Sequence, residues 1–294
     1  MWTLDEKARR RYVRGMTRLG VWYVRTLLER GEIRRDELSA ALSKRVDLYR
    51  FTDLWNGRND SDDGLADAEW RKLSTQIAHW MRETPIGETD GLEERVLALL
   101  EPSIERRLPK DVGPPPARPF GCWTYDLGWA GLADGPGLLG KVRNRAHLAA
   151  ILRRGLRLPP LPSRDCVLHI MNVMVPQSPF DDMPRLAQSL RALIAHVRVQ
   201  HPHVRELWCN TWLNEHPKFR ELLPEVWFRN ATVAPPGNYR NWWGQFARRD
   251  GDFNEAAAQQ FRESGGVFAF RALRCHAALE EIDLHLCSTF HLSL

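Results

Sequence analysis

Apolar residues recur at steps of three and four along the first hundred residues, which is the spacing of one face of an α-helix. The first run of this kind consists of Tyr12, Met16, Leu19, Tyr23 and Leu27. Gly31 is a suitable end for that helix. The same periodicity predicts further helices over residues 35–46, 67–83 and 91–108. Four helices with short connections indicate a bundle-like domain over residues 1–110.

A proline-rich stretch follows this helical pattern. Gly113-Pro114-Pro115-Pro116 cannot continue a helix, so residues 111–119 are interpreted as an extended linker. Beyond it, short apolar runs alternate with helical patterns, as in α/β proteins. The predicted strands are 166–175, 203–209, 226–233 and 267–271, and the predicted helices are 142–154, 184–200, 218–223, 254–263 and 277–286. We therefore expect an α+β or α/β fold, with a helical N-terminal domain followed by a mixed-sheet ligand-binding or catalytic domain over residues 120–294.

Composition and charge narrow the classes of partner. Hydrophobic residues make up 43% of the 294 residues, which allows a sizeable core. The formal net charge is +5, and the arginines are spread along predicted helices. The densest run, Arg9-Arg10-Arg11, lies inside a helical pattern and is interpreted as a solvated face. Nucleic-acid binding would need a basic stripe that this distribution does not indicate, so we expect a small-molecule substrate instead, and an anionic one would suit the charge.

Cysteine usage and hydropathy favour a reducing compartment. The five cysteines are Cys122, Cys166, Cys209, Cys275 and Cys287. Their number is odd, they are widely spaced, and they form no CxxC pair, which argues against a disulfide framework or a cysteine-based zinc site. Charged residues interrupt any apolar core at the N-terminus, and no apolar run reaches about 18 residues. The prediction is a cytoplasmic protein without a membrane partner.

Polar residues stand within and at the ends of two predicted strands. His169 lies in the strand predicted at 166–175, and Asn172 follows three positions later, on the opposite face unless the strand bulges. An imidazole with a pKa of about 6.5 suits a general base. The alternative is a hydrogen-bonded core histidine. His169 is our candidate catalytic residue, and Asn172 is a candidate substrate-binding residue.

The next predicted strand ends in Trp208-Cys209-Asn210-Thr211-Trp212-Leu213-Asn214. Ligands of open α/β sheets gather at the carboxyl ends of strands. Asn210, Thr211 and Asn214 supply hydrogen-bonding groups there, and Trp212 supplies an apolar wall. Cys209 could be a nucleophile, although a small buried thiol explains it equally simply.

A tryptophan pair marks a third candidate segment. Asn241-Trp242-Trp243-Gly244-Gln245-Phe246 follows a Pro-Pro-Gly turn. Two adjacent tryptophans rarely point into one core together, so at least one is expected at the surface, as a ligand wall or an interface. Trp242, Trp243 and Gln245 are therefore candidate substrate-binding residues.

Two weaker motifs complete the search. Gly135, Gly137 and Gly140 fit the pattern G-x-G-x-x-G before a predicted helix, which would let backbone N–H groups bind a cofactor phosphate. Pro136 removes one donor and no clear strand precedes the loop, so a plain turn is the alternative. His201-Pro202-His203 and His216-Pro217 match no metal-ligand spacing, and no metal site is predicted.

The order of these features resembles a family. A helical N-terminal domain, a proline-rich break, the strand Leu168-His169-Ile170 and then the Trp208–Asn214 run resemble bacterial acyltransferase-like proteins with a GNAT-like C-terminal domain. In that family a Cys-x-Ser-Trp-Leu run follows a strand and precedes Leu-Pro. The residues that correspond are Cys209, Thr211, Trp212, Leu213, Leu223 and Pro224. Thr211 replaces the serine, and the family's glycine-containing loop for the CoA pyrophosphate is not visible here.

The resemblance implies a small-molecule acyltransferase-like enzyme of bacterial specialised metabolism, with acyl-CoA as co-substrate. It would use His169 as base or orienting residue, and Asn172, Asn210 and Asn214 to orient the substrate. Two alternatives stay open: a non-catalytic binding or interaction protein that uses the Trp242-Trp243 loop, and an enzyme of another class built on the same pocket. The oligomeric state is left open.

Overall fold

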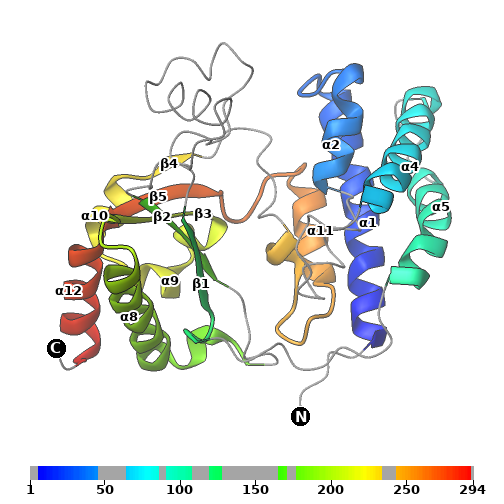
Figure 1. The fold of residues 1–294 in the computed structure, drawn as a ribbon. Coiled ribbons are helices and arrows are strands. Elements are labelled where there is room, and N and C mark those ends of the chain that lie inside the picture. The colour runs from blue at the N-terminus through cyan, green and yellow to red at the C-terminus, as the bar shows by residue number, and fades with distance from the viewer. Residues whose placement is uncertain are drawn as a thin grey trace. The chain divides into compact units, whose positions relative to one another are not determined.

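The chain forms two compact units. The computed structural model of the 294-residue chain describes residues 6–45, 64–85, 91–107, 119–127, 165–170, 177–233 and 243–292 (Figure 1). Unit 1 comprises Met1–Pro116, Val175–Gln177 and Pro235–Phe270. Unit 2 comprises Ala117–Met174, Ser178–Ala234 and Arg271–Leu294. The described residues combine helices with a five-stranded sheet, in agreement with the expected α+β class.

Unit 1 is helical. Its helices are α1 (Glu6–Glu29), α2 (Leu38–Arg45), α4 (Gly64–Glu83), α5 (Leu92–Arg107) and α11 (Glu255–Glu263), with the short 3₁₀ helices η1 (Arg35–Glu37) and η5 (Trp243–Phe246). The apolar stripe of α1 is buried as its periodicity predicts, with Met16 and Leu19 almost inaccessible. It packs in one core with residues of α4 and α5 such as Met81 and Leu100. The four helices predicted in this part of the sequence are present.

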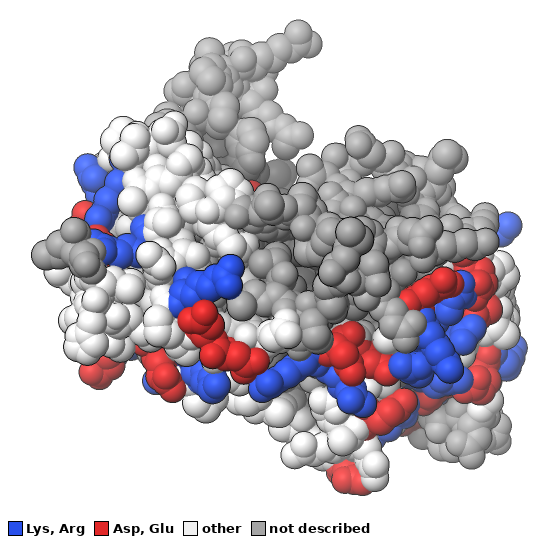
Figure 2. Space-filling model, turned by 90° about the horizontal axis from the view of Figure 1, so that it is seen from below, with Lys and Arg blue, Asp and Glu red and all other residues white. Residues whose placement is uncertain are grey.

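Complementary charges run along the outside of these helices. Arg10, Arg14 and Arg18 recur every four residues on α1 and form ion pairs with Glu105, Glu101 and Glu94 of α5, respectively. Figure 2 shows blue and red side chains interleaved on the face seen from below. Solvent reaches all three pairs, and ion pairs at a protein surface contribute little each, so the apolar stripe rather than the charges stabilises the packing.

Residues 235–270 belong to this helical unit, although the linker at 111–119 suggested that everything from residue 120 onward would be α/β. The reason is aromatic packing. Phe246, Phe253 and Phe261 are buried in the same core as the α1 residues, and the rings of Phe246 and Phe261 lie 5.2 Å apart. Gly15 permits this packing, because a Cβ atom there would lie 2.4 Å from the Phe253 ring. The predicted linker itself lies mostly outside the described residues.

Unit 2 contains the sheet. Its strands are β1 (Trp123–Leu127), β2 (Asp165–Ile170), β3 (Glu206–Thr211), β4 (Thr232–Val233) and β5 (Leu273–Ala278), in the spatial order β1-β2-β3-β5-β4. β2 and β3 are parallel, whereas the other neighbours are antiparallel. A parallel pair needs a crossover connection, and α8 (Met183–Gln200) lies between β2 and β3 in the sequence. The short helices are η2 (Pro179–Asp181), η3 (Trp212–Glu215), α9 (Pro217–Glu221) and α10 (Glu225–Arg229), and α12 (Leu279–Phe290) ends the described chain.

The two faces of the sheet differ in polarity. One face consists of buried apolar residues such as Leu168, Leu207 and Cys275, which share a core with α8, α10 and α12. Figure 1 shows α8 and α12 on the same side of the sheet. Because side chains alternate along a strand, the residues between these positions point to the other face. That face carries the polar residues of the strands and positions the candidate site.

Several predicted elements were wrong. The segment 226–233 was predicted as one strand, but it contains α10 and the short β4, because Pro224 begins a helical turn that buries Trp227. No strand occupies 267–271, and β5 lies a few residues later. β1 was not predicted at all. The predicted helix 142–154 lies outside the described residues. None of the helices described combines the length and the apolar character needed to cross a bilayer.

Candidate functional site

The parallel strands β2 and β3 pair over only half of their length. Their ladder joins Asp165 to Glu206, Cys166 to Leu207 and Val167 to Trp208, and then it ends. Both strands continue for three more residues, β2 paired with β1 and β3 paired with β5. We call these unladdered halves, residues 168–170 of β2 and 209–211 of β3, the fork. Ligands of α/β sheets gather at the carboxyl ends of parallel strands, which is where the fork lies.

A row of polar residues crosses the sheet at the level of the fork. Thr124 pairs with His169, Asn210 pairs with Arg274, and Thr232 also pairs with Arg274. Counting two residues onward from the Val167–Trp208 pair brings His169 level with Asn210 across the fork. We call these five residues the polar row: Thr124, His169, Asn210, Arg274 and Thr232. Their chain neighbours Leu168, Cys209 and Cys275 are buried, so the row lies on the polar face.

His169 is paired with a carboxylate that sequence reasoning missed. Its Nε2 lies 2.9 Å from Oδ2 of Asp126 on β1, and the two side chains are 47% and 77% exposed, so solvent and solutes reach them. A neutral imidazole that donates from Nε2 to a carboxylate keeps its lone pair on Nδ1. The pair therefore holds the ring in an orientation in which Nδ1 can accept a proton.

A second histidine–carboxylate pair lies on the same face, away from the fork. Nδ1 of His276 on β5 lies 3.4 Å from Oε2 of Glu206 on β3, and the two side chains are 42% and 51% exposed. This pair lies between two strands that are laddered along their whole length. It is therefore a matched counterpart of the His169–Asp126 pair that lacks the neighbouring fork.

Trp208 and Arg274 form a platform beside the fork. The guanidinium carbon of Arg274 lies 4.2 Å from the centre of the Trp208 ring, within the range of a cation–π contact. Within the part of the chain that the structure describes, no carboxylate forms an ion pair with Arg274. The indole Nε1 of Trp208 is buried and likewise finds no acceptor among the described residues.

Cys209 is not suited to nucleophilic catalysis. It is buried on the apolar face, and Nδ2 of Asn214 lies 3.6 Å from its Sγ. Burial raises the pKa of this thiol far above its usual value. The protonated form is therefore dominant at neutral pH, and only the thiolate is a strong nucleophile. The alternative of a small buried thiol agrees with this environment.

Asn214 and Thr211 face the protein rather than the polar row. Asn214 is fully buried, its Nδ2 donates to the carbonyl of Leu273 at 2.7 Å, and its Oδ1 accepts from Nε1 of Trp227 at 2.9 Å. Its amide thus joins the end of β3 to β5 and α10. The hydroxyl of Thr211 accepts from the N–H of Leu213 and begins η3. Both side chains therefore stabilise the fold through these hydrogen bonds.

Other predicted site residues lie elsewhere. Trp212 is half-buried at the start of η3, with its ring 6.3 Å from that of His216. Gln245 belongs to unit 1, where its amide exchanges hydrogen bonds with the backbone of Phe270 at 3.0 and 3.2 Å. Of the predicted residues that are described, only His169 and Asn210 share the polar row. Asn172, Trp242, Gly135, Gly137, Gly140 and the side chain of Trp243 lie outside the described residues.

The helix after β2 begins with its own carboxylates. Oδ1 of Asp182 accepts from the N–H of Arg185 at 3.1 Å, and Oδ2 of Asp181 accepts from the N–H of Ser178 at 3.0 Å. Pro184 lies in the first turn of α8 and has no N–H. Helix N-termini bind phosphate through N–H groups that lack other partners. The beginning of α8 is instead occupied by negative side chains.

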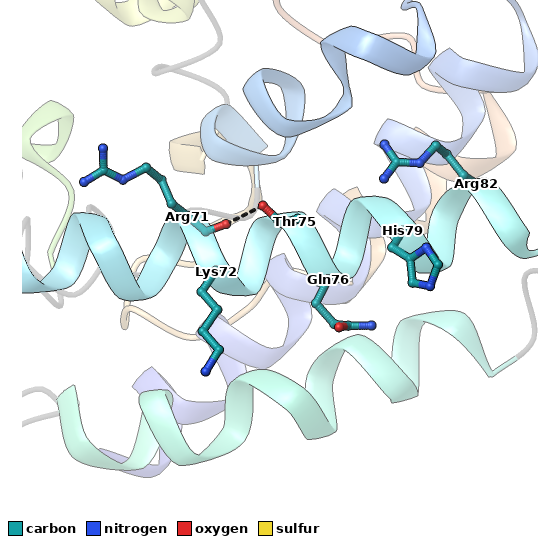
Figure 3. A pocket seen from close by; sticks show the side chains of 6 residues that line it. All are labelled: Arg71, Lys72, Thr75, Gln76, His79 and Arg82. Carbon is teal, nitrogen blue, oxygen red and sulfur yellow. Dashed lines mark hydrogen bonds between the residues drawn. The ribbon is translucent and has the colours of Figure 1, made fainter.

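Two hollows lined by described residues of unit 1 hold no comparable group of side chains. One of about 600 Å³ lies along α4 and is lined by Arg71, Lys72, Thr75, Gln76, His79 and Arg82. Figure 3 shows these six side chains projecting from the single helix. A second, of about 340 Å³, lies between α1 and α11, and its two arginines, Arg18 and Arg262, are already paired with Glu94 and Glu93. Within the described ranges, no group of three or more His, Cys, Asp or Glu could hold a metal ion.

No protein-family model, no curated protein and no solved structure matches the chain.

The residues that sequence reasoning missed had a recognisable signal. Trp123-Thr124-Tyr125-Asp126-Leu127 and Leu273-Arg274-Cys275-His276-Ala277 both alternate between apolar and polar residues, the pattern of a half-buried strand. Locating β1 and β5 from this alternation would have placed Asp126, Arg274 and His276 on a polar face.

Proposed function

We propose that the protein is an acyltransferase-like enzyme that binds a pantetheine-type acyl thioester at the fork and transfers its acyl group to a small molecule on the polar face. The fork is the observation that carries the proposal. It supplies an interior gap in the strand ladder at the end of the sheet where ligands gather, beside a histidine–carboxylate pair.

The order of the strands supports the same family. The sheet has one parallel pair joined by a helix, and its last strand lies between that pair and the preceding strand. A mixed sheet of this kind is compatible with the mixed-sheet α/β domain that the resemblance of the Cys209–Leu213 run implies.

The fork suits an extended ligand that carries amides. Backbone N–H and C=O groups that face each other without a ladder need other partners. Three residues of strand extend over about 10 Å. A pantetheine arm is linear and contains two amide groups, so it can pair with the strand edges as an added strand does. Its thioester would then lie near His169 and Asn210.

The residues of the polar row fit amine acylation. The amine nitrogen of the acceptor attacks the thioester carbonyl carbon, and Nδ1 of His169 takes the proton that the nitrogen loses. The amide N–H of Asn210, level with His169, is placed to stabilise the negative charge on the carbonyl oxygen. The C–S bond then breaks, and the departing thiolate takes up a proton to become the free thiol.

The beginning of α8 limits how the donor is recognised. Carboxylates of Asp181 and Asp182 lie where the phosphates of a CoA ester would otherwise bind a helix N-terminus. We therefore expect the pantetheine arm, rather than the adenosine diphosphate part, to supply most of the binding free energy. Acetyl-CoA and S-acetylpantetheine should bind with similar affinity, within about threefold.

Calorimetry and thermal unfolding with these two thioesters test the proposal. A donor present at 100 times its Kd should stabilise the folded protein by about 2.7 kcal/mol, which raises Tm. The His169→Gln variant should bind the donor normally and lose acyl transfer to a panel of amines, whereas His276→Gln should retain both. Absence of binding by either thioester at millimolar concentration would overturn the proposal.

A further inference from the structure

Arg274 has a different kind of partner from three other arginines of unit 2. Arg191 and Arg198 both pair with Asp283, and Arg271 pairs with Glu215. Among the residues that the structure describes, the guanidinium of Arg274 stacks on an aromatic ring and has no carboxylate partner. Arg220 is stacked in a similar way on Phe228, but its guanidinium also donates to the carbonyl of Asn214. A guanidinium stacked on a ring keeps its N–H donors at its edges. Arg274 therefore offers a positive group whose directional donors have no anionic partner in the described part of the chain.

The position of Arg274 in the sheet determines where its N–H donors lie. Arg274 is the partner of Asn210 in the β3–β5 ladder, so it belongs to the polar row next to the fork. Stacking on Trp208 restricts the guanidinium, which reduces the entropy lost when it binds a ligand.

The spacing of the row relates Arg274 to the reacting end of the site. Neighbouring strands lie about 4.8 Å apart, and two such steps separate β5 from β2. Arg274 and His169 are therefore about 10 Å apart along the row, or somewhat more because the ladder opens at the fork. A ligand could reach both with opposite ends.

We propose that Arg274, supported by Trp208, binds an anionic group of the acceptor, so that the preferred acceptor is an amine with a carboxylate at its far end. This inference rests on the proposed acyl transfer for the role of His169, but the anion site itself does not require a donor. A planar guanidinium can bind a carboxylate through two parallel hydrogen bonds. The carboxylate would fix the acceptor in the row with its amine toward His169.

The probe is 8-aminooctanoate, whose amine and carboxylate are about two strand spacings apart when extended. Octylamine is the matched compound without the carboxylate. Calorimetry in the absence of any thioester should show that the protein binds 8-aminooctanoate at least 10-fold more tightly than octylamine. A charge-assisted hydrogen-bonded pair gives a difference of about 10- to 100-fold.

Three variants assign the effect to the guanidinium. Arg274→Gln should weaken binding of 8-aminooctanoate by at least 10-fold and leave octylamine unchanged. Arg274→Lys keeps the charge but loses the paired donors, so its affinity for 8-aminooctanoate should lie between those of the wild type and Arg274→Gln. Arg205 is exposed and directly precedes β3, at the end of the strand opposite the fork. Arg205→Gln removes an equal charge there, so this variant should bind 8-aminooctanoate as tightly as the wild type. In turnover assays Arg274→Gln should raise KM for the amino acid and change kcat little.

The outcomes separate this inference from the proposed function. Equal affinity of wild type and Arg274→Gln for 8-aminooctanoate would overturn the role of Arg274, whatever the donor experiments show. An equal loss in Arg205→Gln would also overturn it, because the effect would then be one of net charge. If 8-aminooctanoate binding depends on Arg274 but no thioester binds, the anion site stands and the acyltransferase proposal falls.

Discussion

The two edges of β3 behave differently, although they belong to one strand. Toward β5 the ladder covers all six residues, from Glu206 to Thr211, whereas toward β2 it covers three. β3 is therefore a well-formed strand throughout, and the fork is a property of its pairing with β2. The N–H and C=O groups of an edge strand can form hydrogen bonds with water. An incomplete ladder inside a sheet also leaves such groups without a neighbouring strand, so they need another hydrogen-bond partner.

Side chains on the polar face follow the same division. Next to the complete ladder, His276 pairs with Glu206 across β3 and β5. Next to the fork, His169 pairs outward with Asp126 on β1 rather than across toward β3. At the complete edge, the side-chain pair joins the two strands of the ladder, β3 and β5. At the incomplete edge, the side chain of His169 is oriented by a residue of β1 and not by β3.

The largest expected effect concerns proton transfer at the incomplete edge. If His169 is the base, His169→Gln should lower kcat/KM for acyl transfer by about 10²- to 10⁴-fold, the usual contribution of a general base. The matched His276→Gln variant should stay within about twofold of wild type. Steady-state assays of both variants check this. A similar loss in both would mean that the fork has no special part in the chemistry.

Stability should respond most strongly at the complete edge. Asn214→Ala removes the amide that bonds to Leu273 of β5 and to the buried indole of Trp227, and it leaves both groups without a partner. We expect the free energy of unfolding to fall by about 3 kcal/mol. Urea denaturation measures it. Asn230→Ala, which removes an exposed side-chain donor to the carbonyl of His276, is the control and should cost less than about 1 kcal/mol. Equal losses would show that the buried amide has no special role.

Alkaline pH should weaken both edges. Burial raises the pKa of Cys166 on β2 to about 12 and that of Cys275 on β5 to about 11. Above a pH of about 9 the unfolded chain loses these protons while the folded protein retains them, so folding becomes less favourable as pH rises. The slope should approach about 1.4 kcal/mol per pH unit for each thiol up to its folded pKa.

Urea denaturation at pH 8, 9 and 10 tests that slope. In Cys166→Ala, the free energy of unfolding should fall less steeply with pH, because one of the two thiols no longer contributes. Cys275→Ala should have the same effect. A wild-type protein whose free energy of unfolding is constant over this range would contradict the expectation.

The smallest effects concern the two exposed pairs. Asp126→Asn and Glu206→Gln should each change the free energy of unfolding by less than about 1 kcal/mol, because solvent screens both pairs. Only Asp126→Asn should alter catalysis, since it removes the group that orients His169. The tautomer of His169, read from its ¹⁵N chemical shifts, should change in Asp126→Asn and persist in Glu206→Gln. An unchanged tautomer would argue against a positioning role for Asp126.

Sequence periodicity predicted elements with long, regular patterns. The α1 stripe and α8 have three or more turns of consistent apolar spacing, and both are found where expected. Short elements were harder to predict, because a few apolar residues fit both the helical and the strand period. Val226-Trp227-Phe228 is apolar enough for a strand, yet the preceding Pro224 and the partner Asn214 favour a helical turn.

The site was only partly predictable for a related reason. The location of polar residues at strand ends followed from the sequence, and His169 and Asn210 do share a row. Which side of a strand a residue faces depends on register, which a single sequence does not specify. Thr211 turned out to face the protein, and Asn214 lies beyond the strand in the buried turn η3. Asp126 and Arg274 emerged only when β1 and β5 were located.

The packing of Phe253 against Gly15 has a consequence for biosynthesis. α1, α2, α4 and α5 leave the ribosome long before residues 243–263, which carry Phe246, Phe253 and Phe261 into the same core. Domains generally fold from the N-terminus during synthesis, but this one lacks part of its interior until most of the chain has been made. The nascent helical segment must keep an apolar surface exposed through that interval, so mutations that weaken α11 should lower the yield of folded protein in cells before they lower the stability of the purified product.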